Sequence, residues 1–137
     1  MPVFYPTAGS LWLAGITRTA LANSVLKLFQ SSLVPNVNTT KAELDAAEAD
    51  FSGYAAITLT AWGVPYTSPA GGAAINSPCG QFDTDDPTTI TNNIGGAWVE
   101  TAGGVLVIID AFPDAIPMNA PNQSIPIQEI LRFLSGL

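Results

Sequence analysis

Hydrophobic and polar positions alternate with period two in several segments of the chain, most clearly in residues 54–62 (YAAITLTAW). Such alternation predicts a strand with one buried face. The same pattern, with β-branched residues between Gly and Pro turns, predicts further strands. Including 54–62, the predicted strands cover residues 24–30, 64–66, 75–82, 88–92, 97–100, 105–112 and 125–133.

The run VLVIID (residues 105–110) is the most apolar in the chain and predicts a central strand. The segments 97–100 and 105–112 are joined by TAGG, whose glycines suit the positive φ of a tight hairpin turn. Residues 113–122 are rich in proline and predict a loop. Pro126 confines the last strand to a sheet edge or makes it a strand start.

Residues 17–34 carry two competing periodicities. Their apolar residues recur at helical spacing, while the segment around Lys27 also alternates as a strand does. We favour a strand over Ser24–Gln30. The clearest helix is predicted over residues 39–50, where Thr39 or Thr40 caps the first turn and Glu43 stands at the capping-box spacing from Thr40.

Residues 1–16 predict an extended N-terminal arm that Pro and Gly residues interrupt. The arm is strongly apolar, and clustered exposed apolar side chains mark interfaces. Two interpretations stay open: a first strand packed on the protein's own core, or an arm that docks on a neighbouring subunit. For the second, the candidate interface residues are Phe4, Tyr5, Leu11, Trp12 and Leu13.

These elements predict a mainly β fold. Short strands between Gly and Pro turns are typical of an antiparallel β-sandwich or barrel, a jelly roll among them, with one short helix. The 137 residues suit an extended arm over 1–16 followed by a single β-rich domain over 17–137.

Charge is scarce and mostly negative. Charged residues make up 11% of the chain and the formal net charge is −7, with only four basic residues. Four scattered cations do not form the basic patch that nucleic acid or an anionic membrane surface requires. No apolar run approaches the ~20 residues of a membrane span, and no basic segment precedes the interrupted apolar start, so no secretory signal is predicted.

Catalytic chemistry has few candidate residues. The chain has no histidine and one cysteine, Cys79, which excludes His-based triads, His-ligated zinc and internal disulfides. We therefore predict no enzyme, no cofactor and no metal. The cluster Asp83, Asp85 and Asp86 suits calcium, but an Asx-turn before Pro87 explains it equally. The acidic helix 39–50 is interpreted as a solvated face.

The three tryptophans, Trp12, Trp62 and Trp98, allow two interpretations. Aromatic side chains can form a platform for sugars, but tryptophans within alternating strands are by default part of the core. We favour the core for Trp62 and Trp98.

The middle of the chain resembles a family of small phage-encoded proteins found among virion structural genes. The matching motifs are Lys27-Leu28-Phe29, Pro35 with Thr39, and Glu48 through Phe51-Ser52-Gly53-Tyr54, followed by an apolar strand. The layout of VLVIIDAFPDAIPM and IPIQEILRF is also similar, so the likeness covers about two-thirds of the chain. The arm is a departure, since shorter relatives begin near the Lys-Leu-Phe strand.

The resemblance implies a virion structural protein made in the host cytoplasm, of the capsid cement or decoration type. The implied partners are the major capsid protein or other virion proteins, and a homo-oligomer, a trimer among the options. The alternative is a phage tail or adhesin component that binds host glycans. The motifs are structural, and the resemblance implies no catalytic residue.

Overall fold

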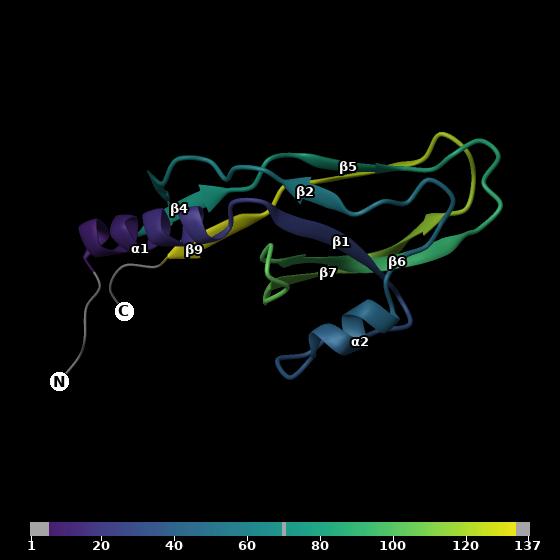
Figure 1. Cartoon of the computed structure of the whole chain (residues 1–137), viewed down its shortest axis with the longest axis horizontal. Helices are drawn as coiled ribbons and strands as arrows, with labels where there is room; N and C mark the ends of the chain where they lie inside the picture. Colours follow the sequence, from purple (N-terminus) through teal and green to yellow (C-terminus); the bar gives the residue numbers. More distant parts are fainter. Residues whose placement is uncertain (1–5, 70, 134–137) are drawn as a thin grey trace. The chain divides into compact units, whose positions relative to one another are not determined.

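The computed structural model of the chain describes residues 6–69 and 71–133. Within these residues it forms two helices and nine strands, most of which are labelled in Figure 1. They are α1 (Thr7–Ala20), β1 (Ser24–Gln30), α2 (Lys41–Ala46), β2 (Ile57–Leu59), β3 (Tyr66–Thr67), β4 (Ala73–Asn76), β5 (Gly80–Asp83), β6 (Asn92–Glu100), β7 (Leu106–Met118), β8 (Ser124–Ile127) and β9 (Ile130–Phe133).

The fold is mainly β, as the alternation predicts. The strands form three antiparallel sheets in the orders β2-β1-β6-β7, β3-β4-β9 and β5-β8. The sheets do not close on themselves, which is consistent with a β-sandwich and not with a barrel.

The strands and helices group into two compact units, where the sequence predicts an arm and one continuous domain. Among the described residues, unit 1 comprises 6–23, 59–69, 71–79 and 128–133, and unit 2 comprises 24–58 and 80–127. Each unit is assembled from separated segments of chain. For this reason the pattern of any single segment does not reveal the division.

The largest difference between the sequence prediction and the structure lies in unit 1. Residues 7–16, expected as an extended arm, belong to the helix α1. Ser10 and Ala14, four residues apart, are fully buried, and α1 contacts β4 and β9. Packing of this narrow face favours a helix despite Gly9 and Gly15, since tertiary contacts override modest helix propensity. Residues 1–5 lie outside the described residues.

The rest of unit 1 packs around small and aromatic side chains. Ala73, Ala74 and Ile75 of β4 are all fully buried. Trp62 is also buried, and its backbone oxygen accepts a hydrogen bond from Arg18 Nε of α1 at 2.8 Å. Trp62 is therefore a core residue, as favoured from the sequence.

The main sheet of unit 2 confirms two predictions and overturns a third. Strand β1 has the predicted bounds, and β6 and β7 form the predicted hairpin, with Gly104 at φ 85° in its turn. However, β7 lies at the edge of the sheet and not at its centre. It also continues to Met118, through residues expected as a loop. Pro113 and Pro117 explain the edge position, because proline donates no ladder hydrogen bond.

Several segments predicted as single strands are divided or shortened. Residues 75–82 separate around Pro78 into β4 and β5, which belong to different sheets, and residues 125–133 divide likewise into β8 and β9. Of residues 54–62 only β2 is a strand, and the predicted strand 88–92 is absent before Asn92. Alternation marks an extended chain, but it does not show where the chain passes from one sheet to another.

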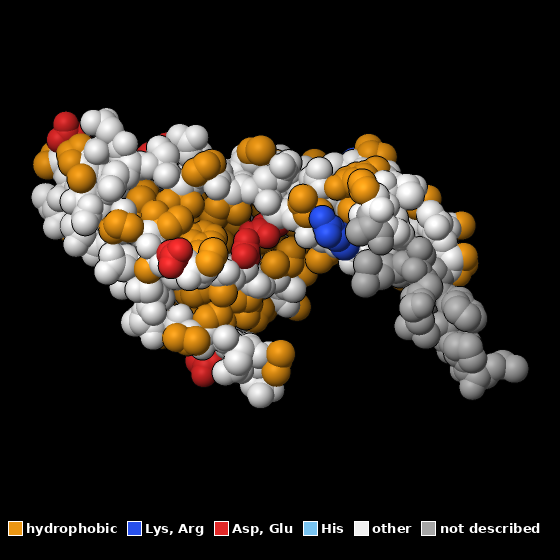
Figure 2. Space-filling view, turned by 180° about the vertical axis from the view of Figure 1, so that it is seen from behind, with side chains coloured by type: hydrophobic (Ala, Val, Ile, Leu, Met, Phe, Trp, Pro, Cys, Tyr) orange, Lys and Arg blue, Asp and Glu red, His pale blue; other side chains and the backbone are white. Residues whose placement is uncertain are grey.

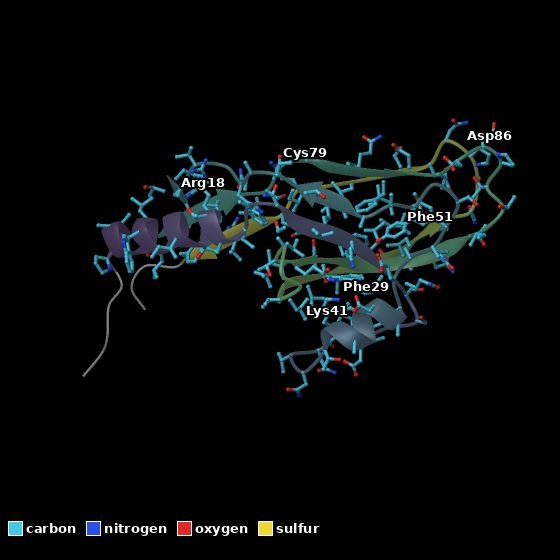
Figure 3. The ribbon with its side chains drawn as sticks, viewed as in Figure 1. Arg18, Phe29, Lys41, Phe51, Cys79 and Asp86 are labelled. Carbon is cyan, nitrogen blue, oxygen red and sulfur yellow. The ribbon has the colours of Figure 1, made fainter. Side chains whose placement is uncertain are left out.

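Helix α2 covers one face of the main sheet. It begins with the predicted capping box, in which Thr40 and Glu43 exchange side-chain-to-backbone hydrogen bonds. Leu44 of α2 packs with Phe29 of β1 and Trp98 of β6 in a fully buried cluster. Figure 3 shows Phe29 on the side of β1 that faces α2. The helix and the loop before it are thus attached to the sheet through this cluster.

Candidate interaction surfaces

Helix α1 has an exposed apolar face on the side away from Ser10 and Ala14. Trp12 is 68% exposed, Ile16 50% and Leu13 37%. Trp12 and Ile16 are four residues apart and so lie one helical turn from each other. We call Trp12, Leu13 and Ile16 the helix face. Exposed tryptophan and aliphatic side chains in one patch are typical of an interaction site.

The structure places the predicted interface residues as follows. Trp12 and Leu13 are exposed on the helix face, Leu11 is half-buried, and Phe4 and Tyr5 lie outside the described residues. Ile16 belongs to the face but was not among the candidates. Its spacing from Trp12 would have identified it only if the segment had been taken as a helix.

A groove in unit 2 is the second candidate surface. One wall is the loop before α2, with Pro35, Asn36, Val37 and Thr39. The other wall is β7, which contributes Leu106, Val107, Ile109 and Ala111. We call this cavity of about 510 Å³ the loop groove. None of the eight lining residues is charged, so the groove suits an apolar partner.

The loop groove extends along β7. A smaller hollow of about 170 Å³ shares Pro35 and Ala111 with it and reaches Phe112. Here the β6–β7 ladder passes from the pair Ile94–Ile116 directly to Gly96–Ala111, so residues 112–115 bulge from the strand. Bulges and prolines block further strand pairing at a sheet edge. They direct any partner of β7 towards its side chains.

The loop wall of the groove is held by local hydrogen bonds. Asn36 N donates to Thr39 Oγ1 at 2.8 Å, and Thr39 N donates to the Asn36 backbone oxygen at 3.0 Å. The Asn36 side chain accepts from Asn38 N at 2.8 Å, which is an Asx-turn. Val37, at the tip, is fully exposed. The exposed apolar side chain of Val37 therefore stands on a turn that local hydrogen bonds close.

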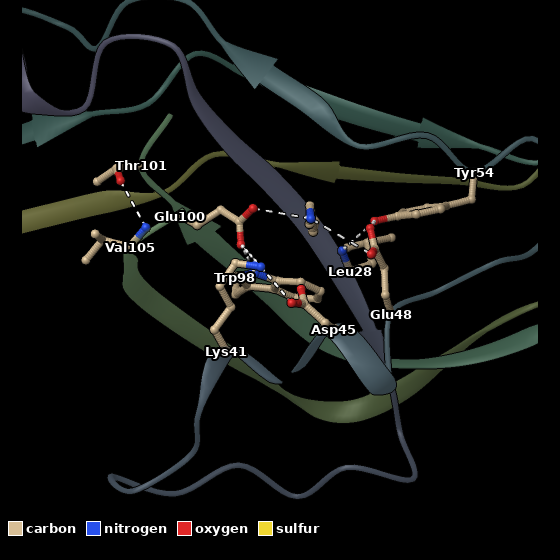
Figure 4. A network of polar contacts seen from close by, with 10 residues as sticks. Leu28, Lys41, Asp45, Glu48, Tyr54, Trp98, Glu100, Thr101 and Val105 are labelled. Atoms are coloured by element: carbon tan, nitrogen blue, oxygen red, sulfur yellow. Dashed lines mark hydrogen bonds and ion pairs between the residues drawn. The ribbon is translucent and has the colours of Figure 1, made fainter. Parts of the chain in front are cut away.

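A polar network attaches α2, and with it the loop wall, to the main sheet (Figure 4). Glu100 of β6 lies at its centre, with Oε1 3.2 Å from Lys27 Nζ and Oε2 3.5 Å from Lys41 Nζ. Trp98 Nε1 also donates to Glu100 Oε2, at 3.2 Å. Lys41 Nζ in turn contacts Asp45 Oδ2 at 2.6 Å. The network therefore joins α2, β1 and β6.

The network shifts the pKa values of its members in directions that follow from its contacts. Burial by itself raises the pKa of Glu100, but the Trp98 hydrogen bond and the two lysines outweigh it and hold that pKa below its ordinary value. The hydrogen bond to Asp45 raises the pKa of Lys41. Burial raises the pKa of Tyr54, whose hydroxyl donates to Glu48 Oε1 at 2.9 Å.

Figure 2 shows one face of the molecule, on which part of the surface of unit 2 can be seen. Hydrophobic side chains gather there in a broad hollow, and a few acidic side chains lie beside it. Exposed apolar surface in unit 2 is thus not confined to isolated side chains. A contiguous apolar surface of this kind is a feature of proteins with partners.

The other chemical candidates have structural explanations. Trp98 and Trp62 are buried, so neither forms part of a sugar platform. Asp83 accepts hydrogen bonds from Ser124 Oγ at 2.6 Å and Gln81 Nε2 at 2.8 Å, which lower its pKa without any cation. Among the described residues, no three Asp, Glu, Cys or His side chains are grouped as metal ligands would be.

Comparison with known proteins identified no relative of the chain. No protein-family model, no curated protein and no solved structure matches the chain. In residues 6–69 and 71–133, no helix has the length and apolar character needed to cross a membrane.

Proposed function

We propose that this chain is a structural protein of a bacteriophage virion, of the capsid cement or decoration type, which binds the major capsid protein or other virion proteins. The proposal combines the resemblance of residues 27–62 to small phage structural proteins with the surfaces described above. The observation that carries it is the helix face, where Trp12 and Ile16 stay exposed on a well-formed helix. Such a face is explained by a protein partner.

The low fraction of charged residues supports the proposal that the protein is part of an assembly. Only 11% of the residues are charged, against roughly 25% in ordinary soluble proteins. A protein that is surrounded by partners has less need of charge to remain in solution.

The energy available at the helix face argues for several contacts acting together. Full burial of a large apolar side chain contributes about 1.5–3 kcal/mol, and roughly half of the three side chains is still exposed, so the face contributes about 2–5 kcal/mol. Association itself costs about 4–15 kcal/mol. The three side chains by themselves do not offset this cost, so attachment also requires burial of apolar surface on the partner, or a homo-oligomer that presents several copies of the chain.

The experiment that tests this proposal is a density map of the virion of the phage that encodes the chain, with mass spectrometry of the purified particles. We expect the chain at a fixed copy number per particle, on or between capsid subunits. Particles that lack the chain should release their DNA at a lower temperature than complete particles.

Two results would contradict the proposal. The first is absence of the chain from particles of a phage that expresses it. The second is a tail location with binding to host glycans, which would support the adhesin alternative. In that case single substitution of Trp12 should abolish glycan binding while the melting temperature is unchanged.

A further inference from the structure

The two units differ strongly in charge. Unit 2 contains ten of the eleven acidic residues and two of the four basic residues, which gives it a formal net charge of −8. Unit 1 contains the acidic Glu129 and the basic Arg18 and Arg132, a formal net charge of +1. A contact between two copies of unit 2 would therefore bring two strongly negative surfaces together. A contact of unit 1 with unit 2 brings opposite charges together.

The apolar surfaces divide in the same way. The helix face belongs to unit 1 and projects outward from α1, while the loop groove belongs to unit 2 and is concave. A cavity of about 510 Å³ lies within the range of roughly 300–1,000 Å³ that holds drug-sized molecules. It therefore has room for an indole and an aliphatic side chain one helical turn away.

We infer that the chain associates with itself head to tail: the helix face of one copy binds in the loop groove of a second copy. Opposite net charge and apolar complementarity both favour this pairing over contacts between two copies of unit 2. The inference rests on the proposed function, because it supplies the homo-oligomer through which several copies of the chain would attach to the virion together. A heterologous contact of this kind closes into a ring or continues as a chain of subunits.

The experiment uses two variants of the full chain. The helix variant carries Trp12→Ser and Ile16→Ser, and the groove variant carries Val37→Asp and Val107→Asp. All four side chains are at least 38% exposed, so each variant should keep the melting temperature and the circular dichroism spectrum of the wild type. Val64→Ser, at a 71% exposed position of unit 1 outside α1, is the matched control.

Sedimentation velocity then measures the oligomeric state. We expect wild type and V64S to associate, and each variant alone to be at least tenfold weaker in self-association. An equimolar mixture of the two variants should form a 1:1 dimer. In that dimer the intact helix face of the groove variant occupies the intact groove of the helix variant, and no further surface is available for growth.

Three outcomes would overturn the inference. Wild type could remain a monomer up to its solubility limit, the groove variant could associate as wild type does, or the mixture could stay monomeric. If the groove variant associates as wild type does while the helix variant does not, α1 pairs with another surface, such as α1 of a second copy. If a variant loses its melting transition, Trp12→Ala and Val107→Ser replace the double substitutions.

Failure of this inference is distinguishable from failure of the proposed function. A wild-type monomer that nevertheless binds to virions would leave the function in place and exclude head-to-tail association. A head-to-tail oligomer that is absent from virions would do the opposite.

Discussion

The ring of Phe29 on β1 lies against Gly96 on β6, its partner in the antiparallel register. A Cβ atom at position 96 would be 2.5 Å from Phe29 Cζ, and it would also meet the backbone oxygen of Asp110. Because Gly96 has no side chain, the Phe29 ring can lie over β6 on the face that α2 covers. There it packs with Leu44 and Trp98 in the core.

Gly96→Ala should therefore destabilise unit 2. Overpacking a closed core costs about 1–3 kcal/mol, and here both the ring and a backbone oxygen would have to move. Urea denaturation measures the loss. Gly103→Ala is the control, because the nearest atom to its Cβ is Thr101 Oγ1 at 3.9 Å. Equal midpoints for the two variants would show that the sheet adapts to a methyl group at position 96.

Thr40→Ala tests the cap of α2. The Thr40 hydroxyl accepts a hydrogen bond from Glu43 N, and its loss should lower the free energy of unfolding by about 1 kcal/mol. Thr40→Ser keeps the hydroxyl and should stay close to wild type. If alanine and serine give the same stability, the capping box does not contribute to folding.

Glu100→Gln tests the polar network. Glutamine keeps the shape of the side chain but removes the charge that Lys27 and Lys41 face, so we expect a loss of about 1–3 kcal/mol at neutral pH. Asp114→Asn, at an exposed position of β7, is the control and should leave the free energy of unfolding unchanged.

The contribution of Glu100 to the free energy of unfolding should decrease as the pH falls. The folded-state pKa of Glu100 lies below its ordinary value of 4.5, so its contribution is complete above that value and is lost as the pH falls through the folded-state pKa. The stability difference between wild type and E100Q should therefore shrink on acidification below pH 4.5. A difference that stays constant down to low pH would contradict this role of Glu100.

Local patterns predicted the elements that short-range spacings specify. The β6–β7 hairpin and the α2 cap depend on contacts within a few residues. The bounds of β1 follow from its own alternation, although its partner β6 lies more than sixty residues away. Partners that are distant in sequence decided the rest. Helix α1 is stabilised by burial of Ser10 and Ala14 against strands more than fifty residues away, and nothing within residues 1–16 indicates those strands.

The candidate surfaces follow the same division. Trp12 and Leu13 could be selected from the sequence because a cluster of apolar side chains is a candidate interface whether the segment is extended or helical. Ile16 required knowledge of the helix. The loop groove could not be predicted, because it joins Val37 to Val107 across seventy residues and exists only once β7 takes an edge position.

The central claim is that the helix face attaches this protein to other virion subunits, and binding to particles tests it most directly. Virions from a phage that lacks the gene are incubated with purified wild type, with W12S/I16S or with V64S, and bound protein is quantified after sedimentation. We expect saturable binding of wild type and V64S, and at least a tenfold loss for W12S/I16S with an unchanged melting temperature. Equal binding of W12S/I16S and wild type, or no binding of wild type, would contradict the claim.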